Sequence, residues 1–210
     1  MTMAKENNLW LAEALFRLGA VQFGDFTLGR TAVGSPVYLN VRKLIGHPDA
    51  LARAAMVMQD EITTLQAMRN PGVAPFDVVA GVPLGGLHIA TAYSLVAKQP
   101  MVYLHPGKDE LVVEGVYDHG QTALIIDDLV TGGGSIAETA ARLREAGLLV
   151  RDAFVLVDRQ QGARERLKAE GINLRAVLTL QVILNYLMAC GLIEDAQYRR
   201  SMAYLESGSA

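Results

Sequence analysis

Two adjacent carboxylates, Asp127 and Asp128, follow the apolar run Ala123–Ile126 and precede a glycine loop, Thr131–Ser135. A glycine loop between a strand and a helix aims free backbone N–H groups at an anion, with the helix dipole behind them. Two carboxylates beside a bound phosphate repel it unless ribose hydroxyls donate to them or a divalent cation bridges them. The pattern therefore predicts a ligand with a phosphate, two sugar hydroxyls and a metal-bound pyrophosphate.

Three other interpretations of this stretch compete. A structural turn explains the glycines but leaves two carboxylates at a buried strand unexplained. An ATP-binding loop of the Walker type needs Gly-Lys-Ser/Thr, and no lysine lies here. A dinucleotide site is the nearest alternative, because Gly132, Gly134 and Ala137 have the G-x-G-x-x-A spacing. Asp158, at the end of the next expected strand, would complete that site, but the acidic pair would then face a pyrophosphate without a metal.

A second glycine loop, Val82–Gly86, joins an expected strand, Phe76–Gly81, to an expected helix, Leu87–Ala97. In a parallel sheet, both loops lie at the carboxyl edge of the strands, where ligands bind. We therefore predict a second anion site here, suited to a pyrophosphate, although a plain β–α turn has the same composition.

Strand and helix patterns alternate along the chain, which predicts an α/β fold with a mainly parallel sheet flanked by helices. The strand expected at 35–42 alternates so that Tyr38 and Asn40 share one face. The polar turn around Lys108 lies between two expected strands, which would form a projecting β-ribbon that acts as a lid. The remaining strands are expected at 21–28, 101–104, 111–116, 123–126, 153–157 and 174–178, and helices at 9–18, 50–68, 136–146, 162–169 and after Thr179.

The bulk composition narrows the class of protein. With 51% hydrophobic residues over 210 positions, the chain can bury a full core as a single domain, 1–210. A net charge of −3 argues against nucleic acid or an anionic membrane as the partner.

The single cysteine, Cys190, suits a reducing cytoplasm, and its apolar neighbours predict a packed thiol. The apolar stretch Val177–Ile193 contains polar residues and falls short of a membrane span, so we expect a buried helix.

The acidic pair with its Thr/Gly/Ser loop resembles the phosphoribosyl pyrophosphate signature of the type I phosphoribosyltransferases. Other segments occur in the order and surroundings of the orotate phosphoribosyltransferases, so that the resemblance runs from Phe23 to the helix after Thr179. These segments are Ser35–Asn40, Ala80–Gly86, Val113–Gly115 and Val157–Arg164. The resemblance implies the type I phosphoribosyltransferase fold, with an N-terminal hood from residues 1–45 and a core from residues 46–205.

The same resemblance implies a Mg²⁺-dependent enzyme that transfers the phosphoribosyl group of phosphoribosyl pyrophosphate to orotate in UMP synthesis. It assigns the ribose hydroxyls to the acidic pair, with Mg²⁺ mainly on substrate oxygens and these two carboxylates as candidate protein ligands. Orotate would lie near Thr131, with Arg159 on its carboxylate or ring carbonyls and Tyr38 against its ring. A surface ion pair is the alternative role for Arg159. The residues implied to bind phosphoribosyl pyrophosphate are Leu84, Gly85, Lys108, Asp127, Asp128, Leu129, Val130, Thr131, Gly132, Gly133, Gly134 and Ser135, of which Lys108, Asp127 and Asp128 are implied to be catalytic.

The family resemblance also implies a cytoplasmic homodimer whose mobile loop is shared across subunits. Here the loop is shorter than in the family, with Lys108 as its one aligned cation and His105 as a candidate replacement for another. The family's N-terminal lysine is missing, and Arg30 is the candidate replacement. Two alternatives therefore stay open: a transferase for another base, and a non-catalytic regulatory protein that binds phosphoribosyl pyrophosphate.

Overall fold

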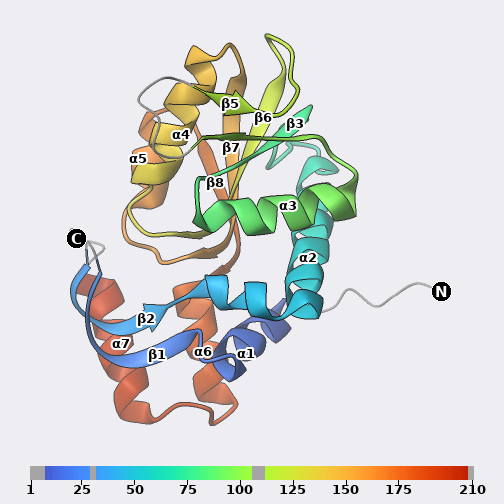
Figure 1. Cartoon of the computed structure of the whole chain (residues 1–210). Helices are drawn as coiled ribbons and strands as arrows, with labels where there is room; N and C mark the ends of the chain where they lie inside the picture. The colour runs from blue at the N-terminus through green and yellow to red at the C-terminus, as the bar shows by residue number, and fades with distance from the viewer. Residues whose placement is uncertain (1–7, 29–31, 106–111, 208–210) are drawn as a thin grey trace.

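Strand β6 (Thr122–Val130) is the centre of a six-stranded sheet in the computed structural model, which describes residues 8–28, 32–105 and 112–207 (Figure 1). It pairs in parallel with β3 (Val78–Gly81) on one side and β7 (Leu149–Asp158) on the other. Beyond these, β4 (Met101–Leu104) and β8 (Asn173–Thr179) are also parallel, and β5 (Val113–Glu114) closes one edge antiparallel to β4. The sheet order is β5-β4-β3-β6-β7-β8, which confirms the predicted mainly parallel α/β sheet.

Alternate side chains of β6 point into two hydrophobic clusters, one on each face of the sheet. Leu124 and Ile126 pack with α2 (Pro48–Gln66) and α3 (Gly85–Ala97). The intervening residues of β6 pack on the opposite face with α4 (Gly134–Glu145) and α5 (Ala163–Ala169). Both faces are covered, as a parallel sheet requires, and the helices lie on either side of the sheet in Figure 1.

A second, smaller layer lies against one end of this core. An antiparallel ribbon of β1 (Val21–Leu28) and β2 (Ala32–Leu39) packs with α1 (Leu9–Arg17). The C-terminal helices α6 (Leu180–Ala189) and α7 (Asp195–Ser207) lie beside it, so that segments from both ends of the chain form this layer (Figure 1). We call this layer the hood.

Several element boundaries differ from those expected. Strand β2 ends at Leu39 instead of Arg42, because a short 3-10 helix, η1 (Val41–Gly46), follows, and Asn40 therefore does not share a strand face with Tyr38. Strand β6 continues through the acidic pair to Val130, and α3 begins two residues early at Gly85. Helix α7 was not expected at all, since its sequence is weakly apolar and only Ser201 and Leu205 are buried.

The apolar stretch Val177–Ile193 contains the end of β8 and the whole of α6, and none of the described helices has the length and hydropathy of a membrane span. The prediction of a packed thiol is wrong: Cys190 is free and exposed, because it caps the C-terminal end of α6 and its side chain does not lie on the buried face of that helix.

Helix α3 packs on β6 through a glycine. A Cβ on Gly86 would lie 2.5 Å from the backbone oxygen of Ile126, well inside van der Waals contact. We predict that Gly86→Ala lowers the free energy of unfolding by about 1–3 kcal/mol, because the helix must move away from the strand. The opposite sign would be expected from helix propensity, which favours alanine by about 1 kcal/mol.

Urea unfolding of the variant beside Gly46→Ala provides the measurement and its control. A Cβ on Gly46 meets no atom within 4 Å, so this variant should differ from the wild type by less than about 0.5 kcal/mol. Equal stability of the two variants would show that α3 is not held by close packing at Gly86.

Candidate active site

The acidic pair is buried at the carboxyl end of β6. Only 6% of Asp127 is exposed, and one of its oxygens accepts a hydrogen bond from the Asp128 backbone N–H at 2.9 Å. Burial, followed by the charge of Asp128, raises the pKa of Asp127 well above its ordinary value. Burial also raises the pKa of Asp128, while the positive charge of Arg42 acts in the opposite direction on both carboxyls. A bound hydrogen-bond donor or a cation would stabilise the ionised form of two carboxylates held together in this way.

The loop after β6 forms a cavity of about 300 Å³ over the N-terminus of α4. Gly133 takes a left-handed conformation, φ +77°, at the position before the helix, which a side chain would strain. The cavity combines backbone N–H groups at a helix N-terminus with one cation, Arg166, from α5. Its lining residues are Asp127, Leu129, Val130, Thr131, Gly132, Gly133, Gly134, Ser135, Ile136 and Arg166.

A second cavity, of about 270 Å³, lies over the loop between β3 and α3. Leu84 has φ +69° and ψ −79°, and Gly85 N donates to Pro83 O across it at 3.1 Å, a rare and strained γ-turn. Such strain persists where the surroundings impose it, and it is common at ligand sites. This cavity is lined by Leu39, Asn40, Val41, Arg42, Val82, Pro83, Leu84, Gly85, Asp127, Asp128, Leu129 and Ser135.

The two cavities meet at the acidic pair. They share Asp127, Leu129 and Ser135, and a Cβ on Gly85 would lie 2.7 Å from Asp128 Oδ1. The two glycine loops that the sequence placed at one sheet edge are therefore side by side, with the carboxyls between them. The arrangement can hold a sugar by its hydroxyls, with a phosphate in one cavity and a second phosphate group in the other.

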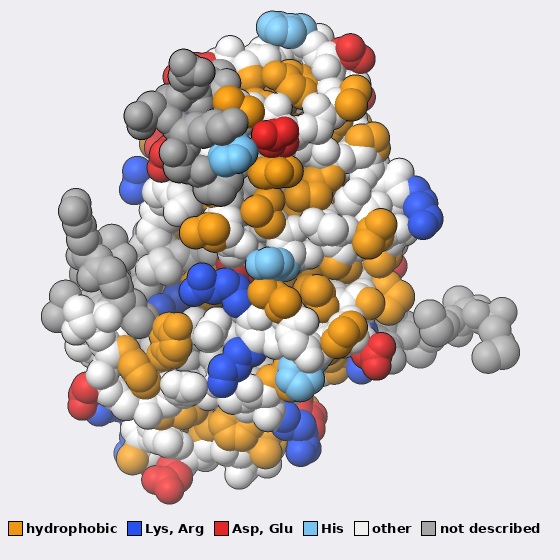
Figure 2. All heavy atoms as spheres, viewed as in Figure 1, with side chains coloured by type: hydrophobic (Ala, Val, Ile, Leu, Met, Phe, Trp, Pro, Cys, Tyr) orange, Lys and Arg blue, Asp and Glu red, His pale blue; other side chains and the backbone are white. Residues whose placement is uncertain are grey.

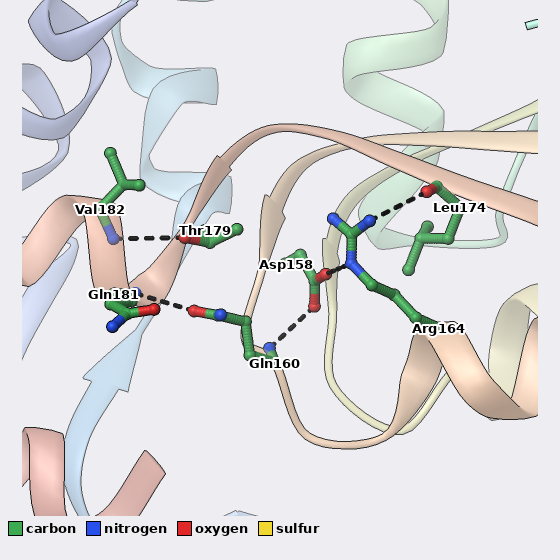
Figure 3. A network of polar contacts seen from close by, with 7 residues as sticks. All are labelled: Asp158, Gln160, Arg164, Leu174, Thr179, Gln181 and Val182. Carbon is green, nitrogen blue, oxygen red and sulfur yellow. Dashed lines mark hydrogen bonds and ion pairs between the residues drawn. The ribbon is translucent and has the colours of Figure 1, made fainter. Parts of the chain in front are cut away.

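Asp158 takes no part in a dinucleotide site. Its carboxylate is fully buried, accepting from Gln160 N at 2.8 Å and from Arg164 Nε at 2.7 Å (Figure 3). Gln160 in turn accepts from Gln181 N at 3.1 Å, linking the turn after β7 to the start of α6. Since both oxygens are engaged, Asp158 has a structural role: it fixes the turn that carries Arg159.

Arg159 is buried beneath the hood, with 2% of its surface exposed. Its Nη2 donates to Ser35 Oγ at 3.1 Å and to Val37 O at 3.2 Å, both on β2. Its Nε has no hydrogen-bond partner among the described residues, and burial lowers its pKa. The alternative of a surface ion pair is therefore excluded. A desolvated guanidinium with donor capacity left is suited to an anionic or carbonyl-bearing ligand.

Like Arg159, the predicted residues Tyr38 and His105 lie in neither cavity lining. The half-buried ring of Tyr38 packs at a tilt on Phe26, with 5.5 Å between centroids, and it lies in neither cavity lining. His105 lies at the base of the β4–β5 ribbon, where its backbone N–H donates to Val112 O at 3.0 Å. Arg30 and Lys108 lie outside the described residues.

Two arginines that the sequence had not suggested line the cavities. Arg42 reaches the second cavity from η1, and Arg166 reaches the first from α5. Arg166 lies two residues after Val157–Arg164, one of the stretches that carry the family resemblance. Whether its side chain reaches the cavity depends on how α5 packs beside the loop. Arg42 was assigned to a strand, and only the turn into η1 brings it to the sheet edge.

The chain has close relatives among characterised proteins. It is 39% identical to an orotate phosphoribosyltransferase of Cenarchaeum symbiosum over 182 residues, 83% of this chain and 86% of the relative. It is 37% identical to an orotate phosphoribosyltransferase of Chlamydia caviae over 196 residues, 90% of each chain. No protein-family model matches the chain.

Solved structures agree with this relationship. The Leishmania donovani UMP synthase superposes with a TM-score of 0.86 at 32% identity, covering 97% of this chain and 43% of the longer synthase. An orotate phosphoribosyltransferase of Mycobacterium tuberculosis in complex with phosphoribosyl pyrophosphate superposes with a TM-score of 0.67 at 27% identity, covering 85% of this chain and 99% of the other. The type I phosphoribosyltransferase fold expected from the sequence is thereby confirmed.

The raised pKa values of the acidic pair predict a pH-dependent stability. A carboxyl whose pKa is raised by folding stabilises the folded state below its ordinary value of 3.8, and this contribution is lost as the pH rises through the raised pKa. The free energy of unfolding of the ligand-free protein should therefore fall as the pH rises from 3.8 through the raised pKa values, and Asp127→Asn should reduce that fall.

Urea unfolding at a series of pH values measures this, with Asp60→Asn, an exposed position on α2, as the matched control. Parallel pH profiles for the wild type and both variants would contradict the raised pKa of Asp127.

Proposed function

The chain belongs to the orotate phosphoribosyltransferase family, and we propose that its two joined cavities hold phosphoribosyl pyrophosphate for transfer to orotate. The products are orotidine 5′-monophosphate and pyrophosphate, a step of UMP synthesis. The observation that carries this proposal is the position of the buried acidic pair between a phosphate-type loop and a second, strained glycine loop.

Each part of the donor has a matching part of the site. Gly132–Ser135 bind the 5′-phosphate through backbone N–H groups at the start of α4. Asp127 and Asp128 accept hydrogen bonds from the two ribose hydroxyls, which supply the donors that the buried carboxyls lack. Leu84 and Gly85 present the second loop to the pyrophosphate. Leu129, Val130 and Thr131 line the first cavity beside the sugar and its 5′-phosphate.

In the reaction, a ring nitrogen of orotate attacks the anomeric carbon of the ribose, and the proton of that nitrogen passes to solvent water. The bond from that carbon to the pyrophosphate oxygen breaks, and its electron pair leaves with the pyrophosphate. Positive charge grows on the sugar in the transition state, close to the carboxylates of Asp127 and Asp128, which stabilise it. The rigid sheet edge holds the sugar and both phosphate groups in place, so that much of the rate comes from positioning.

The donor set of the site fits Mg²⁺. Two adjacent carboxylates beside phosphate oxygens are the kind of partial ligand shell that Mg²⁺ takes together with a substrate. Asp127 and Asp128 would hold the ion jointly with the sugar and pyrophosphate oxygens. When bound, the ion supplies charge neutralisation to the leaving group.

Orotate lies between Thr131 and the hood in this proposal. Arg159 donates to its carboxylate or ring carbonyls through the donors left free beside Ser35 and Val37, and Tyr38 supports its ring from β2. Lys108, which lies between β4 and β5 in the sequence, would contact the pyrophosphate within a homodimer that shares these loop residues across its subunits. We place the enzyme in the cytoplasm, where the exposed thiol of Cys190 stays reduced.

Loss of orotate absorbance in the presence of phosphoribosyl pyrophosphate tests the function. We expect metal-dependent loss that stops with a chelator and is absent without the donor. No loss despite donor binding measured by calorimetry would favour another base or a regulatory role, consistent with the short loop that carries Lys108 and His105 as its candidate basic residues. Absence of donor binding would refute the site assignment itself.

Arg159→Ala tests the orotate contact. The Michaelis constant for orotate should rise by about tenfold or more, since a hydrogen bond to a charged group is lost, while that for phosphoribosyl pyrophosphate should change much less. Because Arg159 also ties the core to the hood, Ser35→Ala is the matched control: it removes one hood hydrogen bond and leaves the guanidinium. A similar rise in both Michaelis constants, or the same effect from Ser35→Ala, would show that Arg159 only holds the hood.

A further inference from the structure

We propose that Arg42 binds the pyrophosphate of phosphoribosyl pyrophosphate and is a fixed cation of the leaving-group cavity. The assignment rests on the proposed function and adds a cation from η1, a segment outside both glycine loops.

The position of Arg42 supports this role. It is an exposed residue of η1 that lines the second cavity together with Leu84 and Gly85 of the strained loop. It also lines a small adjoining cavity with His88, in the second turn of α3, and Asp128. In Figure 2, basic side chains gather midway between the core and the hood, with acidic atoms visible at their edge. Arg42 therefore lies where a pyrophosphate in this cavity would be bound.

The electrostatics of the cavity favour a protein cation there, in addition to any Mg²⁺ carried by the substrate. A pyrophosphate beside Asp127 and Asp128 meets two carboxylates, and backbone N–H groups offset only part of that repulsion. Arg42 acts on both carboxyls from the side of the second cavity, lowering the pKa of each against the effect of burial. A planar guanidinium also donates in pairs to phosphate oxygens, which a lysine cannot do in the same geometry.

The segment that carries Arg42 is fixed rather than mobile. Its neighbours Val41 and Leu44 are buried in the main hydrophobic cluster, and Lys43 Nζ donates to Gly19 O at 2.9 Å. The backbone that carries Arg42 is thus positioned before the substrate binds, so that only the exposed side chain remains to be ordered on binding.

Calorimetry with two probes tests the assignment in the presence of Mg²⁺. Pyrophosphate is the probe for the second cavity, whereas ribose 5-phosphate is the probe for the phosphate loop and the acidic pair. We expect Arg42→Ala to weaken pyrophosphate binding by about tenfold or more, with ribose 5-phosphate changed by less than about twofold. Arg42→Lys should be intermediate, and Arg69→Ala, an exposed arginine after α2, should match the wild type. In turnover, the Michaelis constant for phosphoribosyl pyrophosphate should rise while that for orotate stays constant.

Each other outcome overturns the assignment in a distinct way. Unchanged pyrophosphate affinity in Arg42→Ala, with the wild type binding both probes, removes Arg42 from the site and leaves the proposed function intact. An equal loss of both probes shows that Arg42 acts on the acidic pair and not on pyrophosphate. Failure of the wild type to bind either probe refutes the proposed function together with the role of Arg42. The thermal unfolding temperature of each variant checks that it is folded.

Discussion

The whole site depends on a repulsion that folding creates. Two carboxyls next to one another in sequence, Asp127 buried and Asp128 half-buried, lie at the middle of a sheet edge. Burial makes both harder to ionise, and the charge of Asp128 adds to this effect at Asp127. In the ligand-free protein this arrangement is unfavourable, and among the described residues Arg42 and the backbone N–H groups of Asp128 and Leu129 offset part of it. A bound sugar supplies hydroxyl donors at that point, so part of the free energy lost in folding is recovered on binding. The strength of ligand binding is thus linked to the burial of the site.

Backbone strain is concentrated at the same edge. Leu84 and Gln160 have positive φ without being glycine, and both lie in turns that follow parallel strands at their carboxyl ends. The free-energy cost of these backbone conformations is offset by the packing of the sheet and its helices in two extensive hydrophobic clusters. In return, the turns present backbone groups and Arg159 in defined directions. Rigid strands, strained turns and a buried polar network together explain how the site is ordered before any ligand arrives.

The sequence predicted the core well because its signals are local. Apolar runs followed by glycine loops and amphipathic helices identify β–α units, and parallel pairing then brings both loops to one edge. The remaining features depend on contacts between distant segments. Arg159 is buried because β2, over a hundred positions earlier, covers it, and α7 is helical although its sequence has little apolar periodicity. Arg42 and Arg166 required the turn into η1 and the packing of α5, neither of which residue spacing reveals.

The hood is assembled from segments that are synthesised at very different times. Tyr186 on α6 donates to Glu13 on α1 at 2.9 Å across a separation of 173 residues, and Arg200 on α7 contacts Asp25 on β1. The apolar faces of α1 and the β1–β2 ribbon therefore have no partner from α6 and α7 until those helices leave the ribosome. Closing such distant contacts is slow, and apolar surface exposed in the meantime favours aggregation. A nascent chain of this protein consequently has most of the core folded while the hood is incomplete. In that state, the apolar faces of α1 and the β1–β2 ribbon are a surface to which chaperones can bind.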